Sequence, residues 1–174
     1  IASCPCDGRN LQFIVTRKAG DPLSDQVFGD ELARQTVMLK GPTGHFVLKE
    51  ESTAAALFLA KGKGFAPTKS LVEQAISIDH AEGLHLITVD CYPIRSSLDN
   101  LCRAWNDSLD NFLYTPQAAE TRVEDLIEQL AAAVSGTSTV DIYVAGPTDW
   151  LETLTAAAES KGLGPQHWHC QAVD

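Results

Sequence analysis

The sequence predicts an α/β fold with an all-β amino-terminal part, in which a partial antiparallel barrel precedes a parallel sheet with helices on both faces. Two patterns support this prediction. Before residue 50, short β-branched or alternating runs are separated by turn residues, and from Ala55 apolar runs alternate with amphipathic helical patterns. We place the boundary near residue 52, which gives units of residues 1–52 and 53–174.

The amino-terminal part contains three predicted strands. They cover residues 11–15, 36–40 and 45–49, where β-branched and aromatic residues are frequent. Asp21 and Pro22, and the Gly-Pro-Thr-Gly run at 41–44, are typical of the loops between such strands. We therefore expect a small antiparallel sheet or partial barrel here.

The second part alternates strands with helices. The predicted strands cover residues 55–60, 84–89, 112–115, 140–145 and the last stretch near 167–173, and the predicted helices cover 68–78, 97–105, 121–134 and 149–161. Thr121 and Glu124 have the spacing of a capping box, and Gly162 follows the last helix as a stop signal. The almost wholly apolar strand at 140–145 favours a parallel sheet that is buried on both faces.

Composition excludes some classes of partner. The chain has 174 residues, of which 44% are hydrophobic, so a sizeable core is expected. A formal net charge of -10 argues against binding to nucleic acid or to an anionic membrane, because such binding depends on clustered Lys and Arg. No apolar run reaches the roughly 18 residues of a membrane-spanning helix, and no basic-then-apolar leader is present.

The five cysteines give no clear framework of their own. Their number is odd and they form no CxxC pair, which favours reduced thiols in a cytoplasmic protein. Cys4 and Cys6 lie too close for a zinc knuckle and are expected to be two ordinary thiols. His167 and His169 share one side of a strand and Cys170 faces the other, so no metal site is predicted.

The stretch Leu57 to Pro67, LFLAKGKGFAP, carries the clearest sign of a ligand. It follows a predicted parallel strand and opens a helix, which is where α/β sheets bind nucleotides. Gly62 and Gly64 would let the backbone approach a pyrophosphate, and the helix would offer its free N–H groups. Taken alone, the same residues equally suit a tight strand-to-helix turn without a ligand.

Several segments resemble one protein family, in order and over nearly the whole chain. FLAKGKGFAPTKSLVEQAI resembles the FLAGGTGFAPIKSLIEHA segment of the ferredoxin-NADP reductase superfamily, especially a bacterial branch that includes CDP-6-deoxyglucoseen reductases. Residues 98–116 are similar to that branch's DLARAW and NFRYTP segments, and residues 141–163 to its VYVCGPPAMVEAARAALLERGL ending. Residues 20–28 and 39–48 look like the GGxFSxxLF and GPxGxF segments of the flavin domain.

The resemblance implies a flavin-dependent NAD(P)H oxidoreductase. Electrons would pass from NADH or NADPH through FAD to an iron–sulfur centre or to a protein acceptor such as a ferredoxin or an oxygenase component. A [2Fe-2S] centre would belong to an upstream segment or a partner. Because residues 1–3 resemble the positions directly after the family's RxYS signature, the flavin-holding arginine and tyrosine are expected before Ile1.

The resemblance also implies a set of cofactor-binding residues, while no catalytic residue is assigned. Ser3, Gly20 and Ser24 would lie at the flavin; Lys61, Gly62, Lys63, Gly64, Pro67, Thr68 and Arg95 at the nucleotide; and Gly146 and Pro147 at the nicotinamide. Arg95 would meet a 2'-phosphate or be a solvated loop cation, so NADH and NADPH both stay open.

The departures from the family pattern suggest an alternative. Lys61 and Lys63 replace small or apolar residues of the family turn, and their ammonium groups would either bind phosphate or fill the nicotinamide cleft. Val173 and Asp174 stand where relatives carry an aromatic residue against the flavin. The alternative is a degenerate, non-catalytic subunit that keeps the reductase fold as an interaction or regulatory module.

Overall fold

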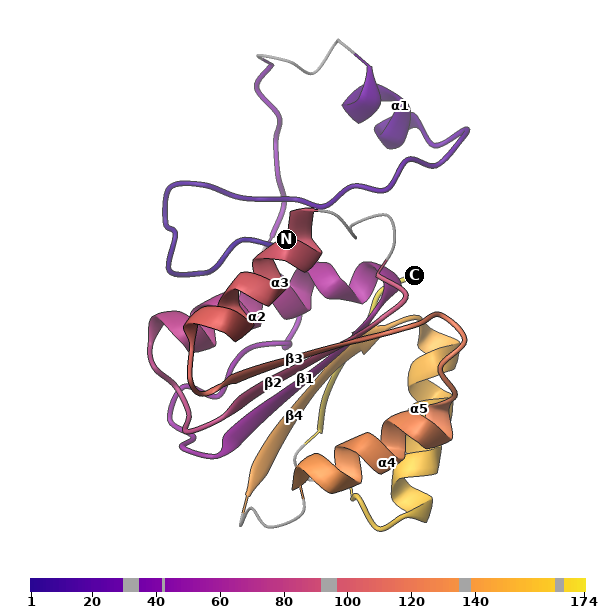
Figure 1. Cartoon of the computed structure of the whole chain (residues 1–174). Coiled ribbons are helices and arrows are strands. Elements are labelled where there is room, and N and C mark those ends of the chain that lie inside the picture. Colours follow the sequence, from indigo (N-terminus) through magenta and orange to yellow (C-terminus); the bar gives the residue numbers. More distant parts are fainter. Residues whose placement is uncertain (30–34, 42, 92–96, 135–138, 165–167) are drawn as a thin grey trace.

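A single sheet of five parallel strands forms the centre of the molecule (Figure 1). The computed structural model describes residues 1–29, 35–41, 43–91, 97–134, 139–164 and 168–174. The strands lie in the order β3-β2-β1-β4-β5, and every neighbouring pair is parallel. Their bounds are β1 Ala55–Lys61, β2 Leu84–Val89, β3 Phe112–Gln117, β4 Val140–Gly146 and β5 Trp168–Ala172. The predicted α/β class with a parallel sheet is confirmed.

Helices cover both faces of this sheet (Figure 1). Their bounds are α2 Phe65–Ser77, α3 Ser97–Ser108, α4 Val123–Val134 and α5 Thr148–Ser160. One core cluster joins α2 and α3 to the sheet through residues such as Val72 and Cys102, and a second joins α4 and α5 through residues such as Leu130 and Leu154. All of β4 is buried, as its apolar sequence predicts.

The topology creates a switch point between β1 and β4. After β1 the chain passes through α2 to β2 on one side, whereas β4 lies on the other side of β1 and is followed by α5 and β5. The helices that follow the two central strands therefore cover opposite faces. In such sheets a crevice opens beyond the carboxyl ends of the two strands, and this crevice is the usual place for a ligand.

The predicted strands at 11–15, 36–40 and 45–49 are not strands in the structure. The described residues before Ala55 contain no strand, and the backbone bond from the Ala2 N–H to the Gln12 carbonyl, at 2.8 Å, links only one pair of positions. Strands need continuous partners for their N–H and C=O groups, and a β-branched sequence alone does not supply them. Ile14, Phe46 and Leu48 nevertheless pack against the core cluster beneath α2.

Helix α1, Pro22–Phe28, corrects the expectation of a loop at Asp21 and Pro22. The Asp21 carboxylate accepts a hydrogen bond of 2.7 Å from the Ser24 N–H, and Pro22 occupies the first helical position. Asp and Pro are favoured at these two positions of a helix as well as in turns. The helix lies apart from the sheet in Figure 1.

The helix predicted from Thr121 is confirmed as α4, but it begins at Val123. The Thr121 hydroxyl donates to the side chain of Gln117 at 3.5 Å, so it turns towards the end of β3. Gly162, with φ +76°, follows α5 as predicted.

Cys4 and Cys6 form a disulfide, which corrects the expectation of two ordinary thiols. Their Cα atoms lie 5.1 Å apart, within the range that a disulfide spans. Sequence spacing does not show whether a CxC pair can turn its two side chains towards each other.

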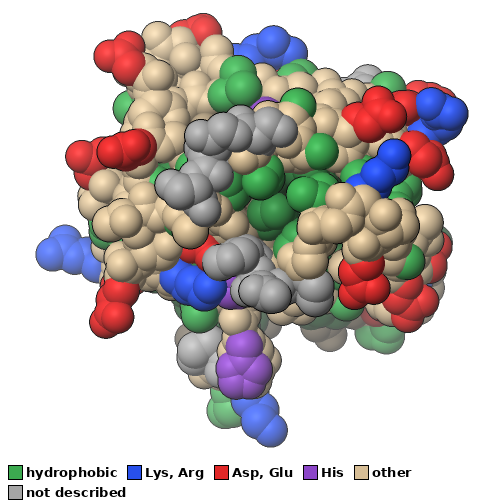
Figure 2. All heavy atoms as spheres, turned by 90° about the horizontal axis from the view of Figure 1, so that it is seen from below, with side chains coloured by type: hydrophobic (Ala, Val, Ile, Leu, Met, Phe, Trp, Pro, Cys, Tyr) green, Lys and Arg blue, Asp and Glu red, His purple; other side chains and the backbone are tan. Residues whose placement is uncertain are grey.

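Charged side chains do not form a single-sign patch on the face seen in Figure 2. Lys and Arg are scattered between acidic side chains there, and hydrophobic side chains lie in the middle of the face. Among the described residues, no helix is both long enough and apolar enough to cross a membrane.

Candidate functional site

Two glycines bring the carboxyl ends of β1 and β4 into direct contact. A Cβ atom on Gly64 would lie 2.1 Å from the Ala145 carbonyl oxygen, and one on Gly146 would lie 2.7 Å from the Trp150 ring. Real Cβ atoms do not approach other atoms so closely, so both positions require glycine. The switch point is therefore built from the two segments that the sequence assigned to the nucleotide.

The turn after β1 leads straight into a helix. Residues Gly62–Gly64 form one 3₁₀ turn, in which Gly62 has φ +55°, and α2 follows at once. Gly64 is the N-cap of α2, and no side chain caps the helix there. Pro67 lies in the first turn, where its missing N–H costs nothing. The Phe65 N–H donates to the Gly62 and Lys63 carbonyls within the preceding turn.

Thr68 serves the helix itself. Its hydroxyl is fully buried and donates 2.8 Å to the Gly64 carbonyl, one turn back. We expected Thr68 at the phosphate, but its hydrogen is used inside α2 and fixes the shape of the turn instead. Thr68 therefore contributes to the site by holding Gly64 in place.

The two lysines of the turn have different surroundings. The Lys61 ammonium lies 5.5 Å from the centre of the Trp150 ring on α5, within the range of a cation–π contact. Lys63 is exposed at the tip of the turn, and its charge helps to lower the pKa of Asp174. The Lys61 ammonium thus lies over an aromatic ring, and the Lys63 ammonium lies near enough to the Asp174 carboxylate to affect it.

The last residues of the chain lie across the end of β4. The Val173 N–H donates to the Gly146 carbonyl at 2.9 Å. The Asp174 carboxylate then accepts two hydrogen bonds at the start of α5, from the Thr148 N–H at 3.0 Å and from its hydroxyl at 2.8 Å. The bonds from the Thr148 backbone and side chain lower the pKa of Asp174. A carboxylate thus occupies the amino end of the helix that follows Pro147.

A cleft of about 310 Å³ opens beside this turn, beyond the carboxyl ends of β2 and β3. Phe65, the first residue of α2, lines it and so connects the cleft with the glycine turn. The lining residues combine aromatic, aliphatic and hydrogen-bonding side chains: Phe65, Thr88, Cys91, Leu98, Asp99, Arg103, Tyr114, Pro116, Gln117 and Ala118. Mixed linings of this kind suit a nucleoside, which has flat apolar faces and polar edges.

Tyr114 organises the polar side of the cleft. Its hydroxyl donates to Asp99 at 2.9 Å and lies 3.2 Å from the Thr88 hydroxyl. Asp99 also pairs with the Arg103 guanidinium at 2.8 Å, which itself lies over the Tyr114 ring. Burial raises the pKa of Tyr114, and the phenol therefore stays protonated and acts as a hydrogen-bond donor.

Asp90 ends β2 in a backbone conformation that favours glycine. Its φ is +46°, and its side chain is exposed at the carboxyl end of the strand. Aspartate tolerates this region better than most residues. Next to it, Cys91 is turned inwards, and burial raises the pKa of its thiol to about 12.

The three residues assigned to a flavin lie in two separate places. The Ser3 carbonyl accepts a hydrogen bond of 2.6 Å from Ser70 on α2. The buried Ser24 hydroxyl accepts a bond of 2.8 Å from the Lys18 N–H, next to the turn at Gly20, where φ is +75°. Arg95 lies outside the described residues, as does His167.

Sequence reasoning missed the cleft residues Thr88, Asp99, Arg103 and Tyr114. They come from two strands and a helix and meet only in the fold. One signal was available, since residues at the carboxyl ends of neighbouring parallel strands share one edge of the sheet.

Curated relatives match the chain, although no protein-family model does. Protein RfbI of Salmonella typhimurium is 31% identical over 95% of this chain and 52% of its own length. A CDP-6-deoxy-L-threo-D-glycero-4-hexulose-3-dehydrase reductase of Yersinia pestis is 31% identical over 49% of this chain and 26% of its own length. The toluate 1,2-dioxygenase electron transfer component of Pseudomonas putida is 24% identical over 91% of this chain. The chain spans at most about half the length of these three relatives, 52%, 26% and 48%.

Solved structures share the fold. A ferredoxin NADP+ reductase from Neisseria gonorrhoeae, solved with bound FAD and NADP, covers 90% of this chain with a TM-score of 0.64 and 15% identity, over 71% of that protein. The ferredoxin reductase of a carbazole 1,9a-dioxygenase covers 91% of this chain with a TM-score of 0.63 and 16% identity, over 49% of that protein. Both structures thus show the fold of this chain.

Proposed function

The chain is a member of the ferredoxin-NADP reductase superfamily, and from this premise we propose that it carries the pyridine-nucleotide site of a flavin-dependent NAD(P)H oxidoreductase. One observation supports this proposal above all others. The glycine turn after β1 and the Gly146–Pro147 turn after β4 meet at the switch point of the sheet, beside a cleft that suits a nucleoside. The amino end of α2, with the exposed Lys63 in the turn before it, would supply the positive charge that a pyrophosphate needs.

Each part of the site has a task in this proposal. The backbone at Gly62 and Gly64, with Lys63 beside it, would hold the pyrophosphate, and Pro67 and Thr68 keep the turn in shape. The cleft around Tyr114 would hold the adenosine by stacking and hydrogen bonding. Gly146 and Pro147 would border the nicotinamide. FAD, when bound, supplies the chemistry that accepts a hydride and releases electrons singly.

Ser3, Gly20 and Ser24 remain candidates for the flavin side. Gly20 and Ser24 flank the start of α1, where Asp21 now accepts the Ser24 N–H. That carboxylate would have to turn aside for a pyrophosphate to approach these groups, because two anions repel each other. We therefore assign the nucleotide, rather than the flavin, to the site where the carboxyl ends of β1 and β4 meet.

We propose NADH rather than NADPH as the preferred nucleotide. In dinucleotide-binding sheets an acidic side chain after the second strand accepts the hydroxyls of the adenosine ribose and repels a 2'-phosphate. Asp90 is exposed in this position. Titration with both nucleotides tests the assignment: NADH should bind at least about tenfold more tightly, and Asp90→Ser should narrow the gap. If the Arg95 guanidinium instead binds a 2'-phosphate, the preference would reverse. Binding of NADPH as tight as that of NADH, or tighter, would contradict the role of Asp90 and indicate this contact.

The names of the relatives support a proposal for the electron acceptor. The toluate dioxygenase component transfers electrons, and we propose by analogy that this protein passes electrons to a ferredoxin, an oxygenase component or a [2Fe-2S] centre on a neighbouring segment.

The unit before residue 53 would form part of the flavin domain, and residues 53–174 would form the nucleotide domain. We place the protein in the cytoplasm. The names of the relatives support an active reductase better than a non-catalytic module.

An anaerobic absorbance titration of the longest natural form of the protein tests this function. The preparation should show a flavin band near roughly 450 nm that bleaches when NADH is added. Two results would contradict the reductase and favour the interaction module. Either the protein shows no bound flavin after incubation with FAD, or it shows a flavin band that neither nucleotide bleaches.

A further inference from the structure

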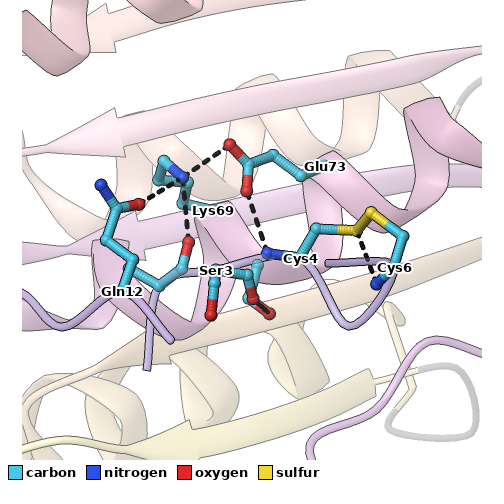
Figure 3. A network of polar contacts seen from close by, with 8 residues as sticks. Ser3, Cys4, Cys6, Gln12, Lys69 and Glu73 are labelled. Carbon is cyan, nitrogen blue, oxygen red and sulfur yellow. Dashed lines mark hydrogen bonds and ion pairs between the residues drawn. A yellow bond between two sulfur atoms is a disulfide. The ribbon is translucent and has the colours of Figure 1, made fainter. Parts of the chain in front are cut away.

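The disulfide between Cys4 and Cys6 lines an open cleft beside Lys69 and Glu73 of α2 (Figure 3). The cleft has a volume of about 530 Å³ and is lined by Ser3, Cys4, Cys6, Asp7, Asn10, Leu11, Gln12, Lys69 and Glu73. We propose that Cys4 and Cys6 form a redox-active pair that exchanges two electrons with a dithiol. This activity would be separate from the proposed reductase function and does not depend on it.

The bond contributes little as a structural cross-link. A disulfide stabilises a fold chiefly by restricting the unfolded chain, and the effect grows with the length of the closed loop. Only Pro5 lies between Cys4 and Cys6, so this loop is about as short as a loop can be. A position on the surface and a minimal loop are typical of disulfides that are easily reduced.

Other contacts already hold this segment in place. The Lys69 ammonium is almost fully buried and donates to the Ala2 carbonyl at 2.9 Å and to the Gln12 side chain at 3.0 Å. It also pairs with Glu73 at 2.6 Å, and Glu73 accepts the Cys4 N–H at 3.1 Å (Figure 3). The backbone at Cys4 would therefore stay fixed whether the sulfur atoms are bonded or free.

The two sulfur atoms differ in a way that gives them separate roles. Cys4 is buried, with 7% of its surface exposed, whereas Cys6 is exposed. An incoming thiolate would therefore reach the Cys6 sulfur first. The Cys6 N–H donates to the Cys4 sulfur at 3.1 Å, and this bond would stabilise Cys4 when it leaves as a thiolate.

The exchange balances without any other reactant. One thiolate of the external dithiol attacks the Cys6 sulfur, the bond between Cys4 and Cys6 breaks, and Cys4 leaves with the electron pair and takes a proton. The second thiol of the reductant then attacks the mixed disulfide and releases the Cys6 thiolate, which is protonated in turn. The external dithiol is oxidised to its disulfide, and the protein pair gains two electrons and two protons.

A redox titration in glutathione buffers tests the proposal on the whole chain. A Cys170→Ser background removes the exposed third thiol and leaves Cys91, which is half-buried, and Cys102, which is buried. After equilibration at graded ratios of reduced to oxidised glutathione, acid quenching, alkylation and mass spectrometry count the thiols. We expect the pair to pass reversibly from disulfide to two thiols within the accessible ratios, while Cys6→Ser in the same background shows no such step.

Two results would overturn the proposal. If the pair stays as two thiols in excess oxidised glutathione, the disulfide does not form in the folded protein. If it stays oxidised in excess reduced glutathione until the protein is denatured, the bond is an inert cross-link.

Single cysteine variants test the separate roles of the two sulfur atoms. In the Cys170→Ser background, Cys4→Ser leaves Cys6 as the reactive thiol, and Cys6→Ser leaves Cys4. We expect an aromatic disulfide reagent to modify Cys6 at least about tenfold faster than Cys4, because only Cys6 is exposed. Equal rates, or a faster reaction at Cys4, would contradict Cys6 as the point of attack.

Discussion

Gly64 lies against Ala145 so closely that a Cβ on the glycine would come within 2.1 Å of the alanine carbonyl oxygen. This contact joins the turn after β1 to the end of β4 and so sets the width of the switch point. The atom that a side chain would strike belongs to a buried backbone and cannot move aside without disturbing β4. Close packing of the two strands and access for a pyrophosphate therefore depend on the same glycine.

Replacing Gly64 with alanine should destabilise the fold. We expect Gly64→Ala to lower the free energy of unfolding by about 2 kcal/mol or more, because the added methyl group forces the two strand ends apart. Urea denaturation followed by circular dichroism measures the change. Gly83→Ala is the matched control, since no atom lies within 4 Å of its new Cβ, and it should shift stability by less than about 0.5 kcal/mol. Equal effects of the two substitutions would contradict the packing described for Gly64.

The lysine at the tip of the turn should contribute to nucleotide binding. If Lys63 attracts phosphate, Lys63→Gln should weaken NADH binding about fivefold, the effect of losing roughly 1 kcal/mol from an exposed charge pair. Lys161→Gln, at the far end of α5, is the control for net charge and should change binding little. Tighter binding by Lys63→Gln would instead mean that the lysine obstructs the cleft. Isothermal titration calorimetry distinguishes these outcomes.

Asp141 should make the fold sensitive to acid. Its carboxylate is 3% exposed and accepts hydrogen bonds from Ser52 at 2.6 Å and from Lys49 at 3.1 Å. Burial alone would raise the pKa of Asp141, but these bonds and the Lys49 charge lower it overall. A lowered folded pKa means that the stabilisation is complete above roughly pH 4, the ordinary value of an unfolded aspartate, and is lost as the pH falls below it.

Thermal melts between pH 7 and pH 3 test this expectation. Asp141→Asn should lower stability by about 1 to 3 kcal/mol at pH 7 and should flatten the loss of stability below roughly pH 4. Asp110→Asn, at an exposed position between α3 and β3, is a control that should leave the profile close to that of the unmodified protein. If Asp141→Asn leaves both the stability at pH 7 and the loss of stability at acid pH unchanged, this carboxylate does not have the proposed role.

Two cysteines should resist modification in the folded protein. Burial raises the pKa of the Cys91 thiol to about 12 and that of Cys102 to about 12. At pH 8 only about one thiol in ten thousand is then ionised, and thiolates are the reactive form. Iodoacetamide followed by mass spectrometry should label Cys170 first, and should label Cys91 and Cys102 at ordinary rates only in urea. Rapid labelling of Cys91 in the native state would contradict its burial.

Much of the sheet and one helix could be predicted because local patterns of apolar residues along the sequence indicate them. The apolar runs at 55–60 and 140–145 match β1 and β4, and the periodic residues after Thr121 match α4. Helix α1 was missed because Asp21 and Pro22 favour both a turn and a helix start. Because the local sequence permits either a turn or the start of a helix, tertiary contacts decide which of the two forms.

The site could be predicted only where one segment contains it. Gly62 and Gly64 follow one another along the chain, whereas the Tyr114, Asp99 and Arg103 group depends on how a helix and a strand pack. The pairing of Cys4 with Cys6 likewise depends on the directions of two side chains. Contacts of this kind have no signature in spacing.

Backbone NMR during titration with NADH tests the nucleotide site most directly. We expect the amide signals of Gly62, Gly64 and Gly146 to shift together with that of Phe65 beside the cleft, while the signals of Cys4 and Cys6 stay unchanged. If saturating NADH leaves the signals of the glycine turn and of Gly146 unmoved, the switch point does not bind the nucleotide and the proposed function is wrong.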